Sequence, residues 1–169
     1  MKVRAALLLA VLALLAGCGL RPLYGGATGT ATLTTLSAVE VAPIEGKSGW
    51  LMTSALRERL NRGKDATPRY RLVVALDDQI EGFGVRTDDA VTRERRSLRA
   101  RYQLIDLDMG TVLLDASAGS DAGIDIVSSE YATIAAEDTA LENLTIAVAD
   151  QIVSRLALYA SRTRARESE

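Results

Sequence analysis

The most constraining feature of this sequence is a long stretch of alternating residue types at positions 91–107. Apolar side chains there occupy every second position, and polar or charged side chains fill the positions between them. The apolar positions are Leu98, Ala100, Tyr102 and Leu104, and the polar positions are Arg95, Ser97, Arg99, Arg101 and Gln103. Because successive side chains of a β-strand point to opposite faces, the stretch predicts one long strand with a buried face and a polar face.

Shorter alternating patterns predict three more strands, at residues 39–41, 70–77 and about 111–118. Pro43 ends the first of them, because proline cannot donate to a strand ladder. We expect residues 82–84 to extend the second strand past an irregular point. Gly119 and Gly123 are expected to loosen the far end of the last strand, with pairing able to resume at residues 124–126.

Apolar residues at helical spacing predict two helices. The first runs from residue 49 or 50 to about residue 62, with Ser48 as its N-cap and Gly63 as its terminator. The second starts within residues 131–137 and ends near Ser161. Its apolar stripe consists of Leu141, Leu144, Val148, Ile152 and Leu156.

The element order β-α-β-β-β-α predicts the fold class. Two helices can cover only one face of a four-stranded sheet, so we expect an α/β two-layer sandwich with a mixed sheet and both helices on one face. The opposite face is expected to carry Val73, Ala75, Ile105, Leu107 and Leu113. A sheet face in water usually shows cleaner polar alternation, so this half-apolar face predicts a protein partner that covers it.

The composition excludes most kinds of active site. The 169 residues include no histidine and one cysteine, which excludes a Ser-His-Asp triad and a Cys/His zinc site. Residues 106–110 resemble the start of a calcium loop, but Ser117 stands where that loop needs a bidentate glutamate, so we expect a polar turn. A hydrolase using carboxylates alone would need two acids in a cleft, whereas the aspartate pairs at 77–78 and 88–89 lie in predicted turns. We predict no catalysis, cofactor or metal.

The N-terminus has the features of a secretory signal peptide, with a basic start and an apolar run too short to span a bilayer. The run ends in Leu-Ala-Gly-Cys at residues 15–18, which resembles the bacterial lipobox. The resemblance implies cleavage after residues 1–17 and acylation of Cys18, which would anchor the chain to a membrane. The alternative is an ordinary signal peptide with a stray cysteine. Gly19, by the same resemblance, indicates the outer rather than the inner membrane.

The predicted domain organisation follows from the anchor. After the signal peptide, residues 18–35 form the lipidated N-terminus and a flexible tether of small and polar residues. Residues 36–162 form the α/β domain, and residues 163–169 form a disordered tail. Removal of the signal peptide leaves 18 basic against 22 acidic residues, so we expect no nucleic-acid partner.

The segment Cys-Gly-Leu-Arg-Pro-Leu-Tyr-Gly at residues 18–25 resembles the mature start of the LptE family of lipopolysaccharide-assembly lipoproteins. In one branch of that family Cys-Gly-Phe-Arg-Pro-Leu-Tyr-Gly is typical, and Leu20 here replaces the phenylalanine. The predicted element order fits as well. Membership would imply a non-enzymatic role at the outer membrane, inside an LptD β-barrel as a plug, helping to deliver lipopolysaccharide to the outer leaflet.

One cluster of arginines is a candidate site for an anionic ligand. Arg93, Arg95, Arg99 and Arg101 share a face at strand spacing. Guanidinium groups match phosphate geometry, and lipid A carries phosphates, so we predict lipopolysaccharide binding here. The alternative is a solvated face, or ion pairs with acids of neighbouring strands such as Asp77 and Asp115.

A second kind of function stays open. Auxiliary lipoproteins of periplasmic lipid-trafficking ABC systems are also small lipoproteins with α/β domains. The octapeptide at residues 18–25 argues against this reading, and copurification with a large β-barrel would separate the two.

Overall fold

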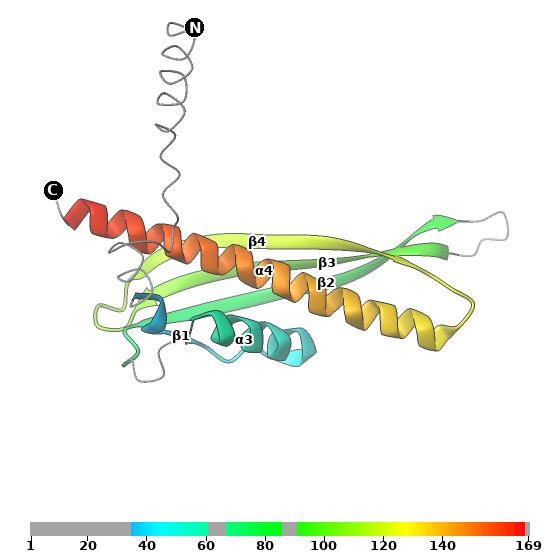
Figure 1. Ribbon diagram of the computed structural model, residues 1–169, viewed down its shortest axis with the longest axis horizontal. Coiled ribbons are helices and arrows are strands. Elements are labelled where there is room, and N and C mark those ends of the chain that lie inside the picture. Colours follow the sequence, from blue (N-terminus) through cyan, green and yellow to red (C-terminus); the bar gives the residue numbers. More distant parts are fainter. Residues whose placement is uncertain (1–34, 61–66, 86–90, 168–169) are drawn as a thin grey trace, which may run out of the picture.

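The computed structural model describes residues 35–60, 67–85 and 91–167. The signal peptide, Cys18, the octapeptide and nearly all of the predicted tether lie outside these residues. The described chain forms two layers, a four-stranded sheet and two helices, and Figure 1 shows α4 running along the sheet with α3 beside it. The elements are β1 (Val39–Val41), α3 (Gly46–Leu60), β2 (Tyr70–Val85), β3 (Val91–Asp106), β4 (Val112–Asp125) and α4 (Glu130–Glu167).

The sheet is mixed, and its strands lie in chain order, β1-β2-β3-β4. β1 pairs with β2 in parallel, and α3 provides the crossover that a parallel pair requires. β2, β3 and β4 pair antiparallel in long hairpins. The predicted fold class, with its element order, is confirmed.

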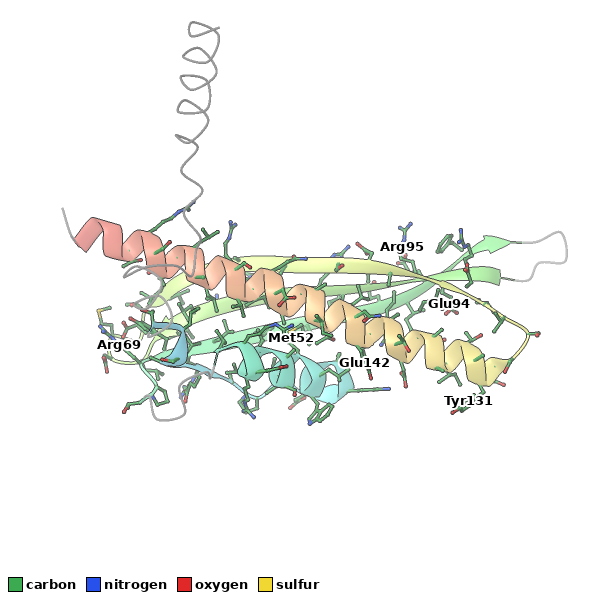
Figure 2. All side chains as sticks on the ribbon, viewed as in Figure 1. Met52, Arg69, Glu94, Arg95, Tyr131 and Glu142 are labelled. Atoms are coloured by element: carbon green, nitrogen blue, oxygen red, sulfur yellow. The ribbon has the colours of Figure 1, made fainter. Side chains whose placement is uncertain are left out.

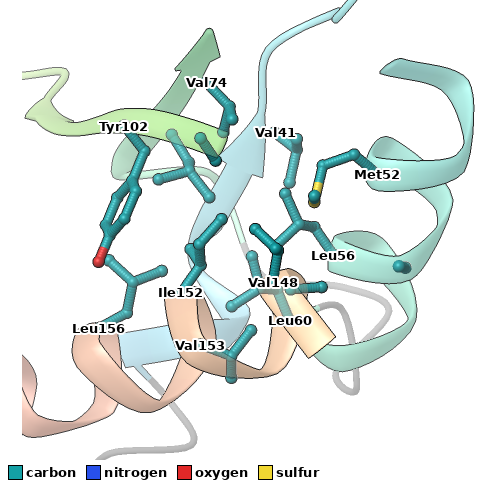
Figure 3. Close-up of a cluster of buried hydrophobic side chains, with 14 of the residues drawn as sticks. Val41, Met52, Leu56, Leu60, Val74, Tyr102, Val148, Ile152, Val153 and Leu156 are labelled. Atoms are coloured by element: carbon teal, nitrogen blue, oxygen red, sulfur yellow. The ribbon is translucent and has the colours of Figure 1, made fainter. Parts of the chain in front are cut away.

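The core lies between the sheet and the two helices. Every second residue of β3 from Leu98 to Leu104 is buried, as the alternation predicts. Figure 3 shows Tyr102 of β3 and Val74 of β2 in one apolar cluster with the stripes of both helices. Burying one such large side chain contributes about 1.5–3 kcal/mol, so this shared cluster holds the layers together. The helix layer is joined further by ion pairs, Lys47 to Asp138 at 2.6 Å and Arg59 to Asp150 at 2.5 Å.

α3 begins earlier than its sequence pattern predicts. It starts at Gly46, so Ser48 lies inside the helix and the predicted N-cap is wrong. Gly46 has a φ of 82°, a conformation open to glycine, and this lets the chain turn into the helix before Ser48. The helix is described to Leu60, and the predicted end at residues 62–63 lies outside the described residues.

β2 and β4 show the extensions that the sequence predicts, but both are more regular than predicted. β2 continues without interruption through residues 82–84 to Val85. β4 pairs with β3 across Gly119 and Gly123 as far as Asp125, so the expected loosening is wrong. Glycine disfavours strands on average, but the ladder on β3 outweighs that preference here.

α4 extends beyond its predicted limits at both ends. It begins at Glu130, where the Ser129 hydroxyl accepts a hydrogen bond from the amide of Ala132 at 3.4 Å, and it runs to Glu167 over 38 residues. No glycine or proline interrupts residues 130–167, so nothing ends the helix near Ser161, and it enters the predicted tail at 163–169. Neither α3 nor α4 combines the length and the apolar character that a bilayer-crossing helix needs.

Candidate functional site on the outer face of the sheet

The face of the sheet opposite the helices, called the outer face below, carries paired arginines and aspartates. Arg99 of β3 donates from Nη2 to both carboxylate oxygens of Asp121 of β4, each at 2.9 Å. Arg101 donates from Nη2 to Asp115 of β4 at 3.0 Å. These contacts follow from the antiparallel register, which sets each arginine two residues diagonally from its acid.

The other two predicted arginines lie near the start of β3, and Figure 2 shows Arg95 well separated along the molecule from Arg69. Arg93 Nε donates to Asp125 at 2.7 Å. Arg95 makes no ion pair with any described residue, and its guanidinium stacks on the ring of Phe83 at 5.4 Å from the centroid. Arg95 is therefore the member of the predicted cluster whose charge is not matched by a direct partner in the described chain.

The outer face is nearly balanced in charge. By register, it carries five arginines and six carboxylates: Arg71, Arg93, Arg95, Arg99 and Arg101 against Glu40, Asp77, Glu81, Asp115, Asp121 and Asp125. The alternative expectation of an ion pair to Asp115 is confirmed for Arg101. Asp77 instead accepts hydrogen bonds from Gln79.

Hydrogen bonds lower the pKa of two aspartates in this network. The pKa of Asp115 falls chiefly because Arg101 and then Gln103 donate to it. The pKa of Asp121 falls because of Ser97, whose hydroxyl lies 2.5 Å away, and then because of Arg99. Both carboxylates are therefore held in their charged form at neutral pH.

Gly119 has a specific role beside Arg99. A Cβ atom at position 119 would lie 2.5 Å from Cδ of Arg99, so the arginine crosses the strand directly over this glycine. The same guanidinium donates to the carbonyl of Ser120 at 3.0 Å. Glycine is an unfavourable residue inside a strand, but here its lack of a side chain allows Arg99 to lie flat across β4.

Arg96, which the sequence places in the same dense run, lies on the opposite face. Its side chain donates to both oxygens of Asp78, at 2.8 and 2.7 Å, and to the carbonyl of Glu137 at 2.9 Å. The residue is only 9% exposed. Arg96 therefore ties β2, β3 and α4 together and is not available to a ligand.

The predicted apolar part of the outer face lies near the β3–β4 turn. Val73 is 38% exposed, Ala75 is exposed, and Ile105 and Leu107 are half-buried. Sequence reasoning missed Val112, which is 51% exposed and pairs with Ile105. These residues form a small apolar patch, called the apolar patch below.

Leu113 does not belong to this patch, and its predicted place is wrong. Leu104 pairs with Leu114 while Ile105 pairs with Val112, so Leu113 is an extra residue in β4. Such a bulge reverses which side chains face the core. Leu113 accordingly packs against the core, and Val112 takes the outward position.

The β3–β4 connection is the polar turn that the sequence predicts. The carboxylate of Asp106 accepts the backbone N–H groups of Asp108 and Met109 at 2.9 and 3.1 Å. Gly110 completes the turn with a φ of 66°. Among the described residues, no group of three or more metal-ligating side chains gathers at one place.

A cavity of about 270 Å³ opens beside this turn, at the same end of the molecule. Apolar and aromatic side chains from the sheet and from α4 line much of it, among them Val39, Tyr70, Leu104, Leu113, Leu156 and Tyr159. The acidic group at its wall, Asp106, is the one committed to the turn. Thr35, Arg69 and Thr163 line it as well, so the wall of the cavity is mixed in character.

Solved structures of other proteins share this fold, among them three lipoproteins. A candidate lipoprotein from Caulobacter crescentus CB15 is 23% identical, with a TM-score of 0.66 over 78% of this chain and 97% of the other. Rare lipoprotein B from Shewanella oneidensis is 11% identical, with a TM-score of 0.55 over 78% and 97%. Lipoprotein B from Nitrosomonas europaea is 11% identical, with a TM-score of 0.55 over 73% and 82%.

No curated protein sequence matches the chain. The model of one family, LptE, described as lipopolysaccharide-assembly, matches residues 36–156. That match begins just before β1 and takes in the whole sheet, α3 and most of α4. The chain therefore belongs to the LptE family.

Proposed function

We propose that this protein is a lipid-anchored outer-membrane protein that partners an LptD-like β-barrel as a plug and assists the assembly of lipopolysaccharide. The observation that carries the proposal is the family match over residues 36–156, which covers the folded domain. The role is non-enzymatic, in keeping with a chain that has no histidine. The same match favours this role over the alternative of an auxiliary lipoprotein in an ABC lipid-trafficking system.

The anchor is Cys18 within the lipobox-like segment 15–18. The solved relatives that share the fold carry the word lipoprotein in their descriptions, which supports a lipidated N-terminus here. Two or more acyl chains on Cys18 would hold the domain at the membrane, because each buried methylene contributes about 0.8 kcal/mol. Replacement of Cys18 by alanine should leave the signal peptide uncleaved or the domain misplaced.

We assign the barrel contact to the outer face, around the apolar patch. Val73, Ala75, Ile105 and Leu107 lie on the side that neither helix covers. Val112 extends the same patch. Burial of this patch by a barrel wall would remove apolar surface from water, whereas the charged rows beside it would form a polar rim, as interfaces usually do.

The test is recovery of the barrel with a tagged form of this protein. Val73→Lys should reduce recovery strongly, because an unpaired charge in a buried interface is costly. Ile146→Lys is the matched control, since Ile146 is similarly exposed but lies on α4. Equal recovery with both variants would reject the outer face as the contact, and absence of a barrel with the unchanged protein would reject the plug role.

Direct lipopolysaccharide binding is a further part of the proposal. Of the predicted arginines Arg93, Arg95, Arg99 and Arg101, we place the leading contact at Arg95, which makes no ion pair in the described chain. A phosphate at the other three would compete with aspartates already in place. Arg95→Ala should therefore weaken lipopolysaccharide capture more than Arg93→Ala does, in proteins of equal thermal stability. The reverse order would contradict this assignment.

A further inference from the structure

The sheet ends on one side at a long strand. β1 forms one edge with three residues, while β4 forms the other with 14 residues. A long edge strand presents unpaired backbone N–H and C=O groups, which can pair with another extended chain. β4 presents such an edge along its 14 residues, and β2 presents another beyond Leu72, where β1 no longer pairs with it. The two are distinguished by a side chain that already occupies the edge of β4.

One side chain already behaves as a neighbouring strand would. The carboxamide of Gln151, on α4, accepts the N–H of Gly119 at 3.3 Å and donates to its carbonyl at 3.2 Å. Because the N–H and C=O of one strand residue point to the same side, and alternate residues repeat that direction, the positions two and four residues away share this orientation. Ser117, Asp121 and Gly123 thus direct their backbone groups away from β3, where the described chain provides no strand.

A groove runs beside this edge. It has a volume of about 450 Å³ and lies between β4 and α4. Ser117 and Ala118 form its strand side, and Ser154, Arg155 and Leu158 form its helix side. A strand added to β4 would place alternate side chains over this groove, where small polar, charged and apolar groups are all within reach.

The charges along β4 indicate the composition of such a strand. Asp115, Asp121 and Asp125 share the outer face of β4, and each is bound from the β3 side by an arginine while its side chain stays exposed. A strand on the other side would meet the same carboxylates. Basic or hydroxyl side chains at alternate positions would complement them, whereas β4 of a second copy would bring three more aspartates to the seam, which is unfavourable.

We propose that the β4 edge accepts an extended segment of a partner protein by strand addition, with arginine, lysine, serine or threonine at alternate positions, and that Gln151 covers the centre of this edge. The inference goes beyond the barrel partnership and does not depend on it. Affinity would come from backbone hydrogen bonds, and specificity from the alternate side chains.

The probe is a nine-residue acetylated peptide of alternating arginine and valine, added to the mature protein in detergent micelles. Binding should slow hydrogen exchange at the amides of Ser117, Asp121 and Gly123. The same peptide with alternate backbone nitrogens methylated keeps its charge but loses donors, so it should bind at least about tenfold more weakly. Equal binding of the two peptides, or no protection at these amides, would overturn the proposal.

Two pairs of variants sharpen the test. Gly123→Pro removes one outward N–H that β3 does not use, and it should weaken the peptide about tenfold. Gly123→Ala is the matched control, because a Cβ atom there meets no atom within 4 Å; it should bind normally. Gln151→Ala frees Gly119 and should tighten binding, with Glu142→Ala as its control, because Glu142 is exposed on α4 and lies outside the groove. If Gln151→Ala self-associates and does not bind the peptide more tightly, the β4 edge pairs with a second copy of this chain. That result would overturn the proposal.

Discussion

Two arginine–aspartate pairs of the same chemistry lie on opposite faces of β3. Arg96 and Asp78 face the helices, with side chains 11% and 19% exposed, and Arg99 and Asp121 face outward, with side chains 50% and 45% exposed. The inner pair is bidentate, with two guanidinium nitrogens on the two carboxylate oxygens, whereas Arg99 reaches both oxygens of Asp121 from Nη2 alone. The inner pair is part of the packing between layers, whereas the outer pair lies in water, where salt and solvent screen it. Position on the sheet, rather than residue type, therefore decides which arginines serve the fold and which are available for contact.

The largest expected effect comes from breaking the inner pair. Arg96→Ala leaves the carboxylate of Asp78 without its partner and frees the carbonyl of Glu137, so the free energy of unfolding should fall by about 3 kcal/mol, toward the lower end for buried pairs. Chemical denaturation of the purified protein measures this loss. The double variant Arg96→Leu with Asp78→Leu should lose less, because it leaves no unpaired charge, and a larger loss in the double variant would contradict the account.

A smaller effect is expected on the outer face. Arg99→Ala removes the contact from Nη2 to the carboxylate of Asp121, but the pair is exposed, so its loss should change the unfolding midpoint several-fold less than Arg96→Ala does. The small effect should shrink further as salt rises, because ions screen exposed charges. Equal destabilisation by the two variants at low and high salt would show that burial does not separate the two faces.

The smallest effect concerns pH. The lowered pKa values of Asp115 and Asp121 mean that the unfolded chain binds protons more readily than the folded one as the solution becomes acidic. Their contribution to stability is therefore present at neutral pH, above the pKa of the unfolded carboxyl, and is lost as the pH falls through the lower folded pKa. Thermal unfolding of the wild type and of Asp121→Asn between pH 7 and pH 3 should converge at the acidic end. A difference in unfolding temperature between the two proteins that grows as the pH falls would contradict this prediction.

The sequence predicts the inner face better than the outer one, for a physical reason. The alternation of Leu98 to Leu104 needs only the rule that apolar groups avoid water, and the structure confirms it. The partner of each outer arginine depends on the β3–β4 register, and the sequence of either strand alone does not predict that register. The bulge at Leu113 shows the same limit, since one extra residue turns Leu113 toward the core and leaves Val112 on the outer face.

Glycines and helix ends show a second limit. Gly119 is a strand breaker by propensity, yet its lack of a side chain is what Arg99 requires. Gly46 starts α3 ahead of Ser48 because it adopts a positive φ that no periodicity signals. The end of α4, by contrast, was open to prediction from residues 130–167, which contain neither glycine nor proline.

We propose that the outer face, and not the helix face, meets the barrel. The most direct measurement places a photo-crosslinking amino acid at Ala75 of the outer face or at Ile146 of α4, in cells that make the protein at its normal level. We predict a crosslink from position 75 to a large β-barrel protein and none from position 146. A barrel crosslink from position 146 without one from position 75 would contradict it.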